Sequence, residues 1–137
     1  MLDKTDWEII ALLKENAKLQ LRDIGEKVHL TGQAVANRIS KLENWGIIKG
    51  YTVILDDMKL GNGIAAYVKI YMKTTDHGSF QTFLRESPFV AEAHRISGEG
   101  CYLLKVSASS QEELNRFLDQ CLAFGNYGLN ISIGQIK

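Results

Sequence analysis

The fold of this chain is organised around residues 31–48, which read TGQAVANRISKLENWGII. Thr31 is a good N-cap, because its hydroxyl can accept a hydrogen bond from the free N–H groups of a first helical turn. Apolar residues then recur on one helical face, at Val35, Ile39, Leu42 and Trp45. Gly46 follows, and glycine readily adopts the left-handed conformation that ends helices. The stretch predicts a helix with one buried face.

The opposite face of this helix is polar, with Gln33, Asn37, Arg38 and Lys41. Amide side chains can pair with adenine, arginine can pair with guanine, and both cations can bind phosphates. An ordinary amphipathic surface helix would show the same pattern, so the helix alone does not identify a DNA-binding element.

The preceding residues favour the DNA-binding interpretation. Leu21, Ile24 and Val28 predict a second short helix, and residues 29–32 join the two helices. A short helix, a tight turn containing glycine and a second helix with polar outward residues form the helix-turn-helix pattern. The candidate DNA-binding residues are Thr31, Gln33, Ala34, Asn37, Arg38, Lys41 and Lys49.

The charge of the chain is balanced. Among 137 residues there are 16 basic and 16 acidic side chains, so the protein is not coated with positive charge. Residues 31–49 contain three basic residues, Arg38, Lys41 and Lys49, and one acidic residue, Glu43. This modest excess predicts weak DNA binding by one copy and makes an oligomer the expected remedy.

The two cysteines, Cys101 and Cys121, lie in apolar runs without a Cys or His at metal-ligand spacing. We therefore expect reduced, buried thiols, with no metal and no cofactor. The charged N-terminus lacks a signal-peptide core, and no apolar run approaches the roughly 20 residues of a membrane span. A soluble, cytoplasmic, nucleoid-associated protein is expected.

Residues 1–50 are predicted to form the DNA-binding domain. Asp3 can cap a first helix that runs to about Lys14 or Asn16, with Trp7, Ile10 and Leu13 as its buried stripe and Ile9 and Leu12 widening that stripe. Residues 47–55 are rich in β-branched and aromatic side chains, which predicts either a short hairpin, or wing, or an extended linker. Turn-forming residues place a linker or hinge strand at residues 51–63.

Residues 64–137 have the pattern of a second domain. Residues 64–73 alternate strictly as a strand, and residues 77–86 have helical spacing that ends before Pro88. Two strands, 90–96 and 101–108, flank a turn at 97–100. Ser109 or Ser110 caps another helix, residues 125–128 break it, and residues 129–133 form the last strand. The order β-α-β-β-α-β is the ferredoxin-like arrangement of an α+β protein, with both helices on one sheet face.

The other face of this sheet needs a cover. Large residues point to both faces of the strands, as Tyr67 and Tyr71 do opposite Val68 and Ile70. Since the two helices cover one face only, a partner subunit is expected on the other.

The sequence resembles the Lrp/AsnC family of bacterial and archaeal transcription regulators over essentially its whole length. The resembling motifs are Asp3-x-x-Asp6-x-x-Ile9, Asp23-Ile24-Gly25, Val35-x-x-Arg38-Ile39-x-x-Leu42-Glu43-x-x-Gly46-Ile47-Ile48 and Gly98-x-x-x-Tyr102-Leu103-Leu104.

The resemblance implies a winged helix-turn-helix joined to a βαββαβ regulation-of-amino-acid-metabolism (RAM) domain. It implies homodimers that assemble further, often to octamers, on paired half-sites of double-stranded DNA. It points to Arg38 as a DNA contact, for which the alternative is a solvated or intramolecular salt-bridge arginine. It also implies an amino-acid effector bound between subunits, near the turn that joins the second and third strands.

The chain departs from the family at this turn. Members that sense amino acids commonly have an aspartate where this chain has Cys101, and a thiol is a poorer partner for an α-ammonium group than a carboxylate. The sequence is therefore compatible with two alternatives, an amino-acid effector and effector-independent DNA binding. A pocket, if formed, is expected to be lined by Ser97, Gly98, Glu99, Gly100, Cys101 and Tyr102.

Two other functions were weighed against an effector-responsive regulator. The missing aspartate is compatible with an effector-independent architectural protein that bends or wraps DNA. An enzyme is disfavoured, because there is no Gly-rich phosphate loop and because nothing in the sequence fixes Cys101 beside His94 and Glu92.

Overall fold

The computed structural model describes residues 1–137, which divide into two units, Met1–Ile54 and Leu55–Lys137. Each unit has its own hydrophobic core. No helix in either unit combines the length and apolar character that crossing a membrane would require.

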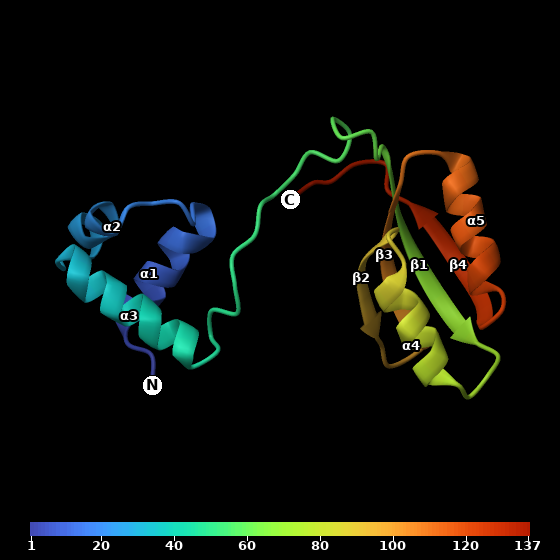
Figure 1. The fold of residues 1–137 in the computed structure, drawn as a ribbon, viewed down its shortest axis with the longest axis horizontal. Coiled ribbons are helices and arrows are strands. Elements are labelled where there is room, and N and C mark those ends of the chain that lie inside the picture. The colour runs from blue at the N-terminus through green and yellow to red at the C-terminus, as the bar shows by residue number, and fades with distance from the viewer. The chain divides into compact units, whose positions relative to one another are not determined.

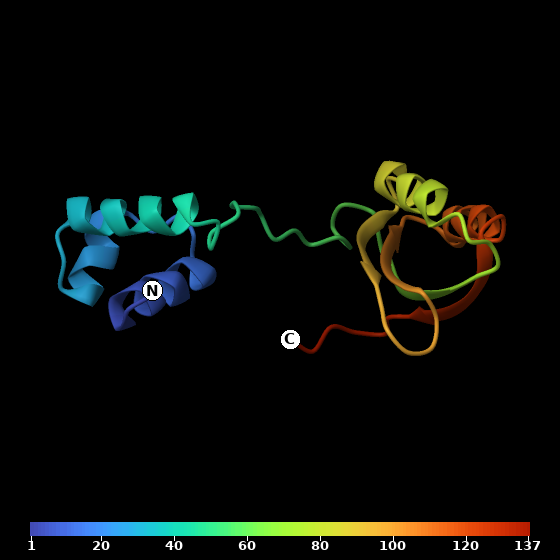
Figure 2. The same cartoon turned by 90° about the horizontal axis from the view of Figure 1, so that it is seen from below.

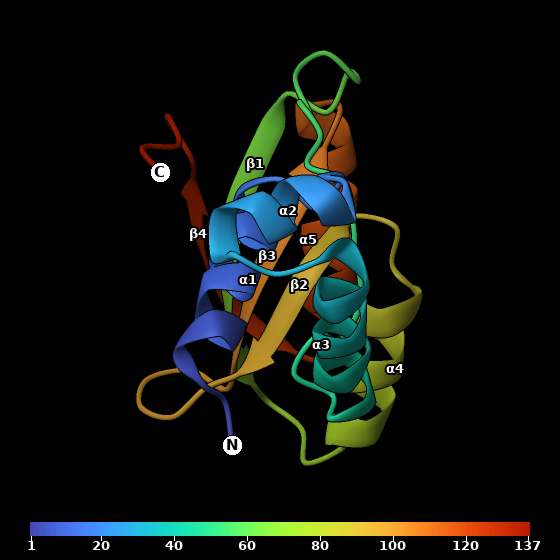
Figure 3. The same cartoon turned by 90° about the vertical axis from the view of Figure 1, so that its left-hand side faces the viewer.

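The N-terminal unit contains three helices, α1 (Lys4–Glu15), α2 (Leu21–Val28) and α3 (Gly32–Asn44) (Figures 1 and 3). Four of their buried apolar residues, Ile9, Ile24, Val28 and Val35, form one cluster. Asp3 caps α1, because its side chain accepts from the N–H of Asp6 at 2.8 Å. The three predicted helices are thus present, close to their expected bounds.

The prediction of which helix faces are buried was partly wrong. Trp7 is 60% exposed and Trp45 is 48% exposed, although both were assigned to buried stripes. The inward face of α1 is instead centred on Asp6 and Ile9. Three short helices bury only a narrow stripe of each helix; Trp7 lies about 100° past the buried Asp6, and Trp45 is the C-cap that follows the last residue of α3.

The wing predicted within residues 47–55 is not formed. No strand lies between Asn44 and Ile64, so the alternative expectation of an extended linker is the one observed. A strand needs a partner for its backbone groups, and no other segment pairs with this one. Its apolar side chains remain exposed, including Val53, Ile54 and Leu55.

The C-terminal unit has the predicted βαββαβ order. Its elements are β1 (Ile64–Met72), α4 (His77–Glu86), β2 (Val90–Arg95), β3 (Tyr102–Ala108), α5 (Gln111–Cys121) and β4 (Gly125–Ile131). The four strands pair antiparallel in the order β2-β3-β1-β4. Both helices lie on the same face of the sheet, as Figure 2 shows.

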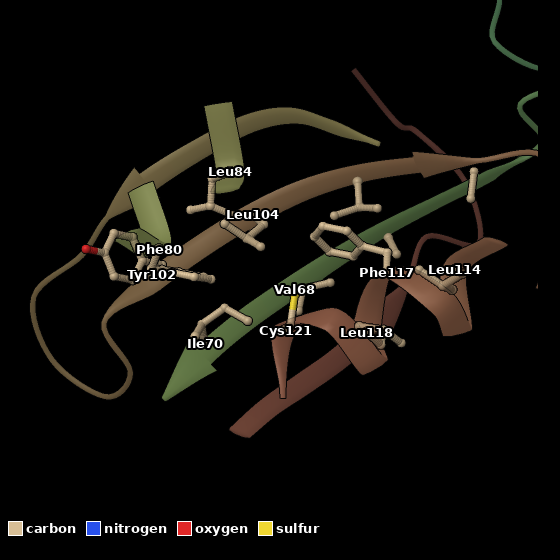
Figure 4. Close-up of a cluster of buried hydrophobic side chains, with 13 residues drawn as sticks. Val68, Ile70, Phe80, Leu84, Tyr102, Leu104, Leu114, Phe117, Leu118 and Cys121 are labelled. Atoms are coloured by element: carbon tan, nitrogen blue, oxygen red, sulfur yellow. The ribbon is translucent and has the colours of Figure 1, made fainter. Parts of the chain in front are cut away.

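The core of this unit fills the space between the sheet and its two helices. Val68, Ile70 and Leu104 point from the strands towards Phe80 and Phe117 on the helices (Figure 4). These side chains are fully buried, and burying a side chain of this size stabilises a fold by about 1.5–3 kcal/mol. The packing fixes which residues of each strand face outward.

The last strand was predicted to begin at Leu129, after a glycine break, and this was wrong. Strand β4 begins at Gly125 and pairs with β1 through residues 125–131. A Cβ atom on Gly125 would lie 2.2 Å from the carbonyl oxygen of Tyr71. The glycine therefore permits close approach of two backbones and does not interrupt the strand.

No helix or strand of the C-terminal unit covers the outer face of its sheet. Tyr67 and Tyr71 are 43% and 39% exposed there, and Leu103 and Lys69 lie opposite each other in the β1–β3 register. The hydroxyl of Ser107 on this face is buried without a hydrogen-bond partner. This outer face is therefore open to a second molecule.

Candidate nucleic-acid interface

The turn between α2 and α3 is built by local contacts. His29 ends α2 in the left-handed conformation, with φ of 59°, and the N–H of Leu30 donates to the carbonyl of Gly25 at 2.9 Å. Thr31 then caps α3, because its Oγ1 accepts from the N–H of Ala34 at 3.1 Å. These bonds fix the path of the chain into α3.

Four polar residues form an exposed stripe on α3, directly opposite its buried residues Val35 and Leu42. This α3 stripe consists of Gln33, Asn37, Ser40 and Asn44. At about 100° per residue the four positions fall within one narrow sector of the helix. Sequence reasoning found Gln33 and Asn37 but missed Ser40 and Asn44, which the same spacing could have identified.

The two amides at the start of the stripe are hydrogen-bonded to each other. Gln33 Nε2 donates to Asn37 Oδ1 at 3.0 Å, and both side chains are exposed. The bond leaves the amide oxygen of Gln33 and the amide hydrogens of Asn37 free. The pair thus presents one acceptor and one donor to any approaching surface.

Arg38 is held inside the N-terminal unit by two carboxylates. Its Nη1 donates to Asp3 at 2.7 and 2.8 Å and to Asp6 at 3.0 Å. The hydrogen bond from Arg38 is the largest cause that lowers the pKa of Asp3, and the hydrogen bond to Asp3 is the largest that raises the pKa of Arg38. The intramolecular salt bridge, which was the alternative to a DNA contact, is what the structure shows.

The remaining candidate DNA-binding residues differ in their surroundings. Lys41 is exposed and its Nζ lies 5.0 Å from the ring centroid of Trp45, a cation–π distance. Lys49 is exposed in the linker, Thr31 is exposed at the cap, and Ala34 is half-buried. Lys41 and Lys49 are therefore the cations in this region that no carboxylate pairs.

The turn between β2 and β3 is tight and glycine-rich. Gly98 and Gly100 have φ values of 90° and 81°, which other residues rarely adopt. Ser97, Gly98 and Glu99 are exposed, whereas Gly100 and Cys101 are half-buried. The N–H of Cys101 donates to the carbonyl of Ile70 at 2.7 Å, which anchors the turn to β1.

The side chain of Tyr102 lies on the inner face of the sheet, towards the helices. It is 2% exposed, and its hydroxyl is hydrogen-bonded to His77 Nδ1 at 2.7 Å and to Gln81 Nε2 at 3.1 Å. Its hydroxyl therefore points towards α4, whereas the other five residues of the predicted effector set form the turn itself.

A groove of about 440 Å³ lies between α4 and β2. Its lining includes Gln81 and Arg85 from α4, Arg95 at the end of β2, and Tyr102. Sequence reasoning identified only Tyr102, because nothing in the residue pattern indicated that α4 would stop short of covering β2. Two guanidinium groups and the carboxylate of Glu92 lie on this lining, and such a set can meet both charged groups of a ligand that carries a carboxylate and an ammonium.

The cysteines differ in burial. Cys121 is fully buried, and this desolvation raises its pKa to about 12, whereas Cys101 is half-buried. No group of three or more His, Cys, Asp or Glu residues has the arrangement of a metal site.

Two family models match the chain, one on each unit. The AsnC-type helix-turn-helix domain matches residues 2–43, and the Lrp/AsnC ligand binding domain matches residues 65–136. Among curated proteins, the HTH-type transcriptional regulators LrpB and LrpA of Bacillus subtilis (strain 168) are 46% and 38% identical to it. The alignments cover 99% and 98% of this chain and 91% and 100% of those proteins.

Solved structures show the same fold. The structure of B. subtilis LrpC has a TM-score of 0.95 at 31% identity and covers 100% of this chain and 98% of that one. The complex of transcriptional regulator NMB0573 from Neisseria meningitidis with L-Met has a TM-score of 0.94 at 27% identity, over 100% of this chain and 93% of that one.

Proposed function

The chain belongs to the Lrp/AsnC family of DNA-binding transcriptional regulators, and we propose that it reads DNA with the α3 stripe. The observation that carries this proposal is the placement of four exposed polar side chains opposite the buried face of α3. A helix with this arrangement can enter the major groove with its polar side towards the base edges. The relatives are transcriptional regulators, in agreement with the expectation that the protein is not an enzyme.

The paired amides of Gln33 and Asn37 are the proposed base-reading element. The free oxygen of Gln33 can accept from adenine N6, and the free amide hydrogens of Asn37 can donate to adenine N7. Because the two side chains already hold each other, little rotamer freedom is lost on binding. Each good base contact of this kind discriminates by about 1–3 kcal/mol.

Phosphate binding is assigned to Lys41, Lys49 and the hydroxyl of Thr31. The two lysines are exposed and lack a carboxylate partner, and the Thr31 hydroxyl can donate to a phosphate while it accepts from Ala34. Arg38 is left out of the contact set because its Nη1 is already bound to two carboxylates.

The proposed domains are a DNA-binding domain at residues 1–50, a hinge at residues 51–63 and a RAM domain at residues 64–137. The proposed location of the protein is the nucleoid, in the cytoplasm.

A second copy is proposed to cover the outer face of the sheet. Tyr67 and Tyr71 supply large, partly apolar surfaces there, and the buried hydroxyl of Ser107 lacks a partner within the chain. Aromatic side chains are enriched in protein interfaces because they bury a large area. A dimer formed on this face would carry two α3 helices, one for each half-site of a paired DNA target.

The effector is proposed to be an amino acid held at the β2–β3 turn and the adjoining groove. Arg95 ends β2 and Tyr102 begins β3, so both flank the turn and also line the groove. The guanidinium groups of Arg85 and Arg95 can bind an α-carboxylate. The complex of NMB0573 with L-Met supports this class of ligand, and Cys101 makes the turn a weaker partner for the α-ammonium group.

Two experiments test the proposal. Purified protein is first incubated with a pool of random duplexes, and bound sequences are recovered and sequenced. The Kd for the selected duplex is then measured by fluorescence anisotropy for Asn37→Ala and Lys41→Gln. Asn37→Ala is expected to lose discrimination at one base position, whereas Lys41→Gln should weaken selected and scrambled duplexes equally. Equal losses for both variants on both duplexes would indicate an architectural DNA-binding protein.

The effector is tested by thermal unfolding against each of the twenty amino acids. A ligand that binds only the native state stabilises it by RT ln(1 + [L]/Kd), which is about 2.7 kcal/mol at 100 times Kd. A shift seen in the native chain and lost in Arg95→Gln supports the proposed site. No shift at millimolar concentrations of any amino acid would exclude an amino-acid effector.

A further inference from the structure

The three charged residues Asp3, Asp6 and Arg38 form a cluster that joins α1 to α3. Asp3 is the N-cap of α1, Asp6 lies in its first turn, and Arg38 lies in the middle of α3. One guanidinium nitrogen donates to both carboxylates within 3.0 Å. We call these three side chains the α1–α3 clamp.

Both carboxylates of the clamp have a second role at the start of α1. The N–H of Asp6 donates to Asp3 Oδ1 at 2.8 Å, and the N–H of Asp3 donates to Asp6 Oδ2 at 3.0 Å. This reciprocal pair is a capping box, which fixes the first turn of the helix. Since Arg38 binds the same two carboxylates, the start of α1 and the middle of α3 are held as one unit.

Asp6 is the part of the clamp that most requires its partner. It is 5% exposed and is the charged residue in the buried set of the chain. A buried carboxylate without a cation is costly, because the lost hydration is not replaced. Moving the guanidinium out to a DNA phosphate would leave Asp6 in that state, so the structure favours retention of Arg38 by the clamp.

Arg38 directly follows Asn37 of the α3 stripe, so its tether sets the rotation of α3 about its own axis. We propose that the clamp is a positioning device for DNA recognition, in which Asp3 and Asp6 hold Arg38 so that the α3 stripe faces the groove. Arg38 then acts through α3 and not as a phosphate contact. This role rests on the proposed contact of the α3 stripe with DNA.

The variant Asp3→Asn distinguishes the positioning role of the clamp from a purely electrostatic effect on DNA affinity. Loss of a carboxylate beside DNA reduces repulsion of phosphates, so electrostatics alone predicts tighter binding by Asp3→Asn. Positioning predicts weaker binding, since the clamp loses one of its two anchors. Asn is as good an N-cap as Asp, so the variant keeps the start of α1 and the folded unit.

The test measures Kd for the selected duplex as a function of KCl concentration for Asp3→Asn, Arg38→Gln and the double variant. Glu8→Gln is the matched control, because it removes another carboxylate of α1 whose only ion pair is the exposed one with Lys4. Unfolding of the N-terminal unit is followed in parallel, and binding is compared where every variant is folded. Asn37→Ala reports separately on the proposed α3 contact.

The clamp predicts that Asp3→Asn and Arg38→Gln each weaken binding at least about twofold, and that the double variant is no weaker than either. The slope of log Kd against log salt should stay unchanged, while Glu8→Gln should bind as tightly as the parent or tighter. Tighter binding by Asp3→Asn, together with a slope reduced by about 0.9 in Arg38→Gln, would overturn the clamp and make Arg38 a phosphate contact. An unaffected Asn37→Ala would instead contradict the α3 contact.

Discussion

Gly25 is a residue at which adding a single methyl group should destabilise the N-terminal unit and leave the stability of the C-terminal unit unchanged. It lies on the buried side of α2, and a Cβ atom there would be 2.3 Å from the carbonyl oxygen of Leu30. That oxygen belongs to the backbone of the turn into α3, so it cannot move aside as a flexible side chain would. Gly25→Ala must therefore push α2 and the turn apart.

The size of the effect follows from two opposing terms. Real Cβ atoms essentially never approach closer than 3.0 Å, so the turn must move by about 0.7 Å, and overpacking of this kind costs about 1–3 kcal/mol. Replacement of a helical glycine by alanine returns about 0.5–1 kcal/mol. At the midpoints of these two ranges, about 2 and about 0.75 kcal/mol, the net loss of about 1.25 kcal/mol should lower the Tm of the N-terminal unit by roughly 5–10 °C.

The assay is thermal unfolding by circular dichroism and calorimetry, with DNA binding measured below the transition. Gly32→Ala is the matched control, because its Cβ would lie 3.5 Å from the nearest atom, the amide nitrogen of Arg22, which is ordinary contact. The transition of the C-terminal unit should not change in either variant. An unchanged or raised Tm for Gly25→Ala would refute the assignment of this turn as tightly packed.

Three further predictions concern the sheet, the thiols and the response to acid. Tyr67→Asp should place a charge on the outer face and shift the protein towards monomer in analytical ultracentrifugation, whereas an unchanged dimer would locate the interface elsewhere. Cys121, with its pKa raised to about 12 by burial, should resist iodoacetamide at pH 8 in the folded protein while Cys101 reacts, as read by mass spectrometry. The hydrogen bond from Arg38 lowers the pKa of Asp3 below its ordinary value of 3.8. The ionised Asp3 carboxylate therefore stabilises the folded protein above pH 3.8, and this stabilisation is lost as the pH falls through the lowered pKa of the folded state. Asp3→Asn should flatten the dependence of Tm on pH below about 4.

Local patterns determined most of the secondary structure. The caps Asp3, Thr31 and Ser110 lie where their helices begin, and the alternation from Ile64 to Met72 matches β1. These features depend on neighbours a few residues apart, which a sequence displays directly. The order of strands and helices therefore followed from the sequence alone.

The errors arose where distant residues decide the outcome. Gly125 was interpreted as a helix break, because its close contact with the backbone of Tyr71 belongs to a strand pairing that local patterns do not reveal. Arg38 was predicted to contact DNA, with an intramolecular salt bridge as the alternative, and its salt-bridge partners could not be located from the sequence because they lie 32 and 35 residues away in the chain. Tyr102 was predicted to line an effector pocket, and its hydrogen bond with His77 was not foreseen, because that contact depends on how α4 packs against the sheet.

The salt dependence of DNA binding should report how many copies of the chain bind one DNA target. With Arg38 engaged by two carboxylates, Lys41 and Lys49 are the cations of the interface left for phosphates. At about 0.9 per neutralised phosphate, one copy should give a slope of log Kd against log salt of about 1.8 in magnitude, and two copies about 3.6. The smaller value on a paired half-site would mean that only one α3 is engaged. The larger value, reduced to the smaller one by Tyr67→Asp, would show that the outer sheet face brings the second helix to the DNA.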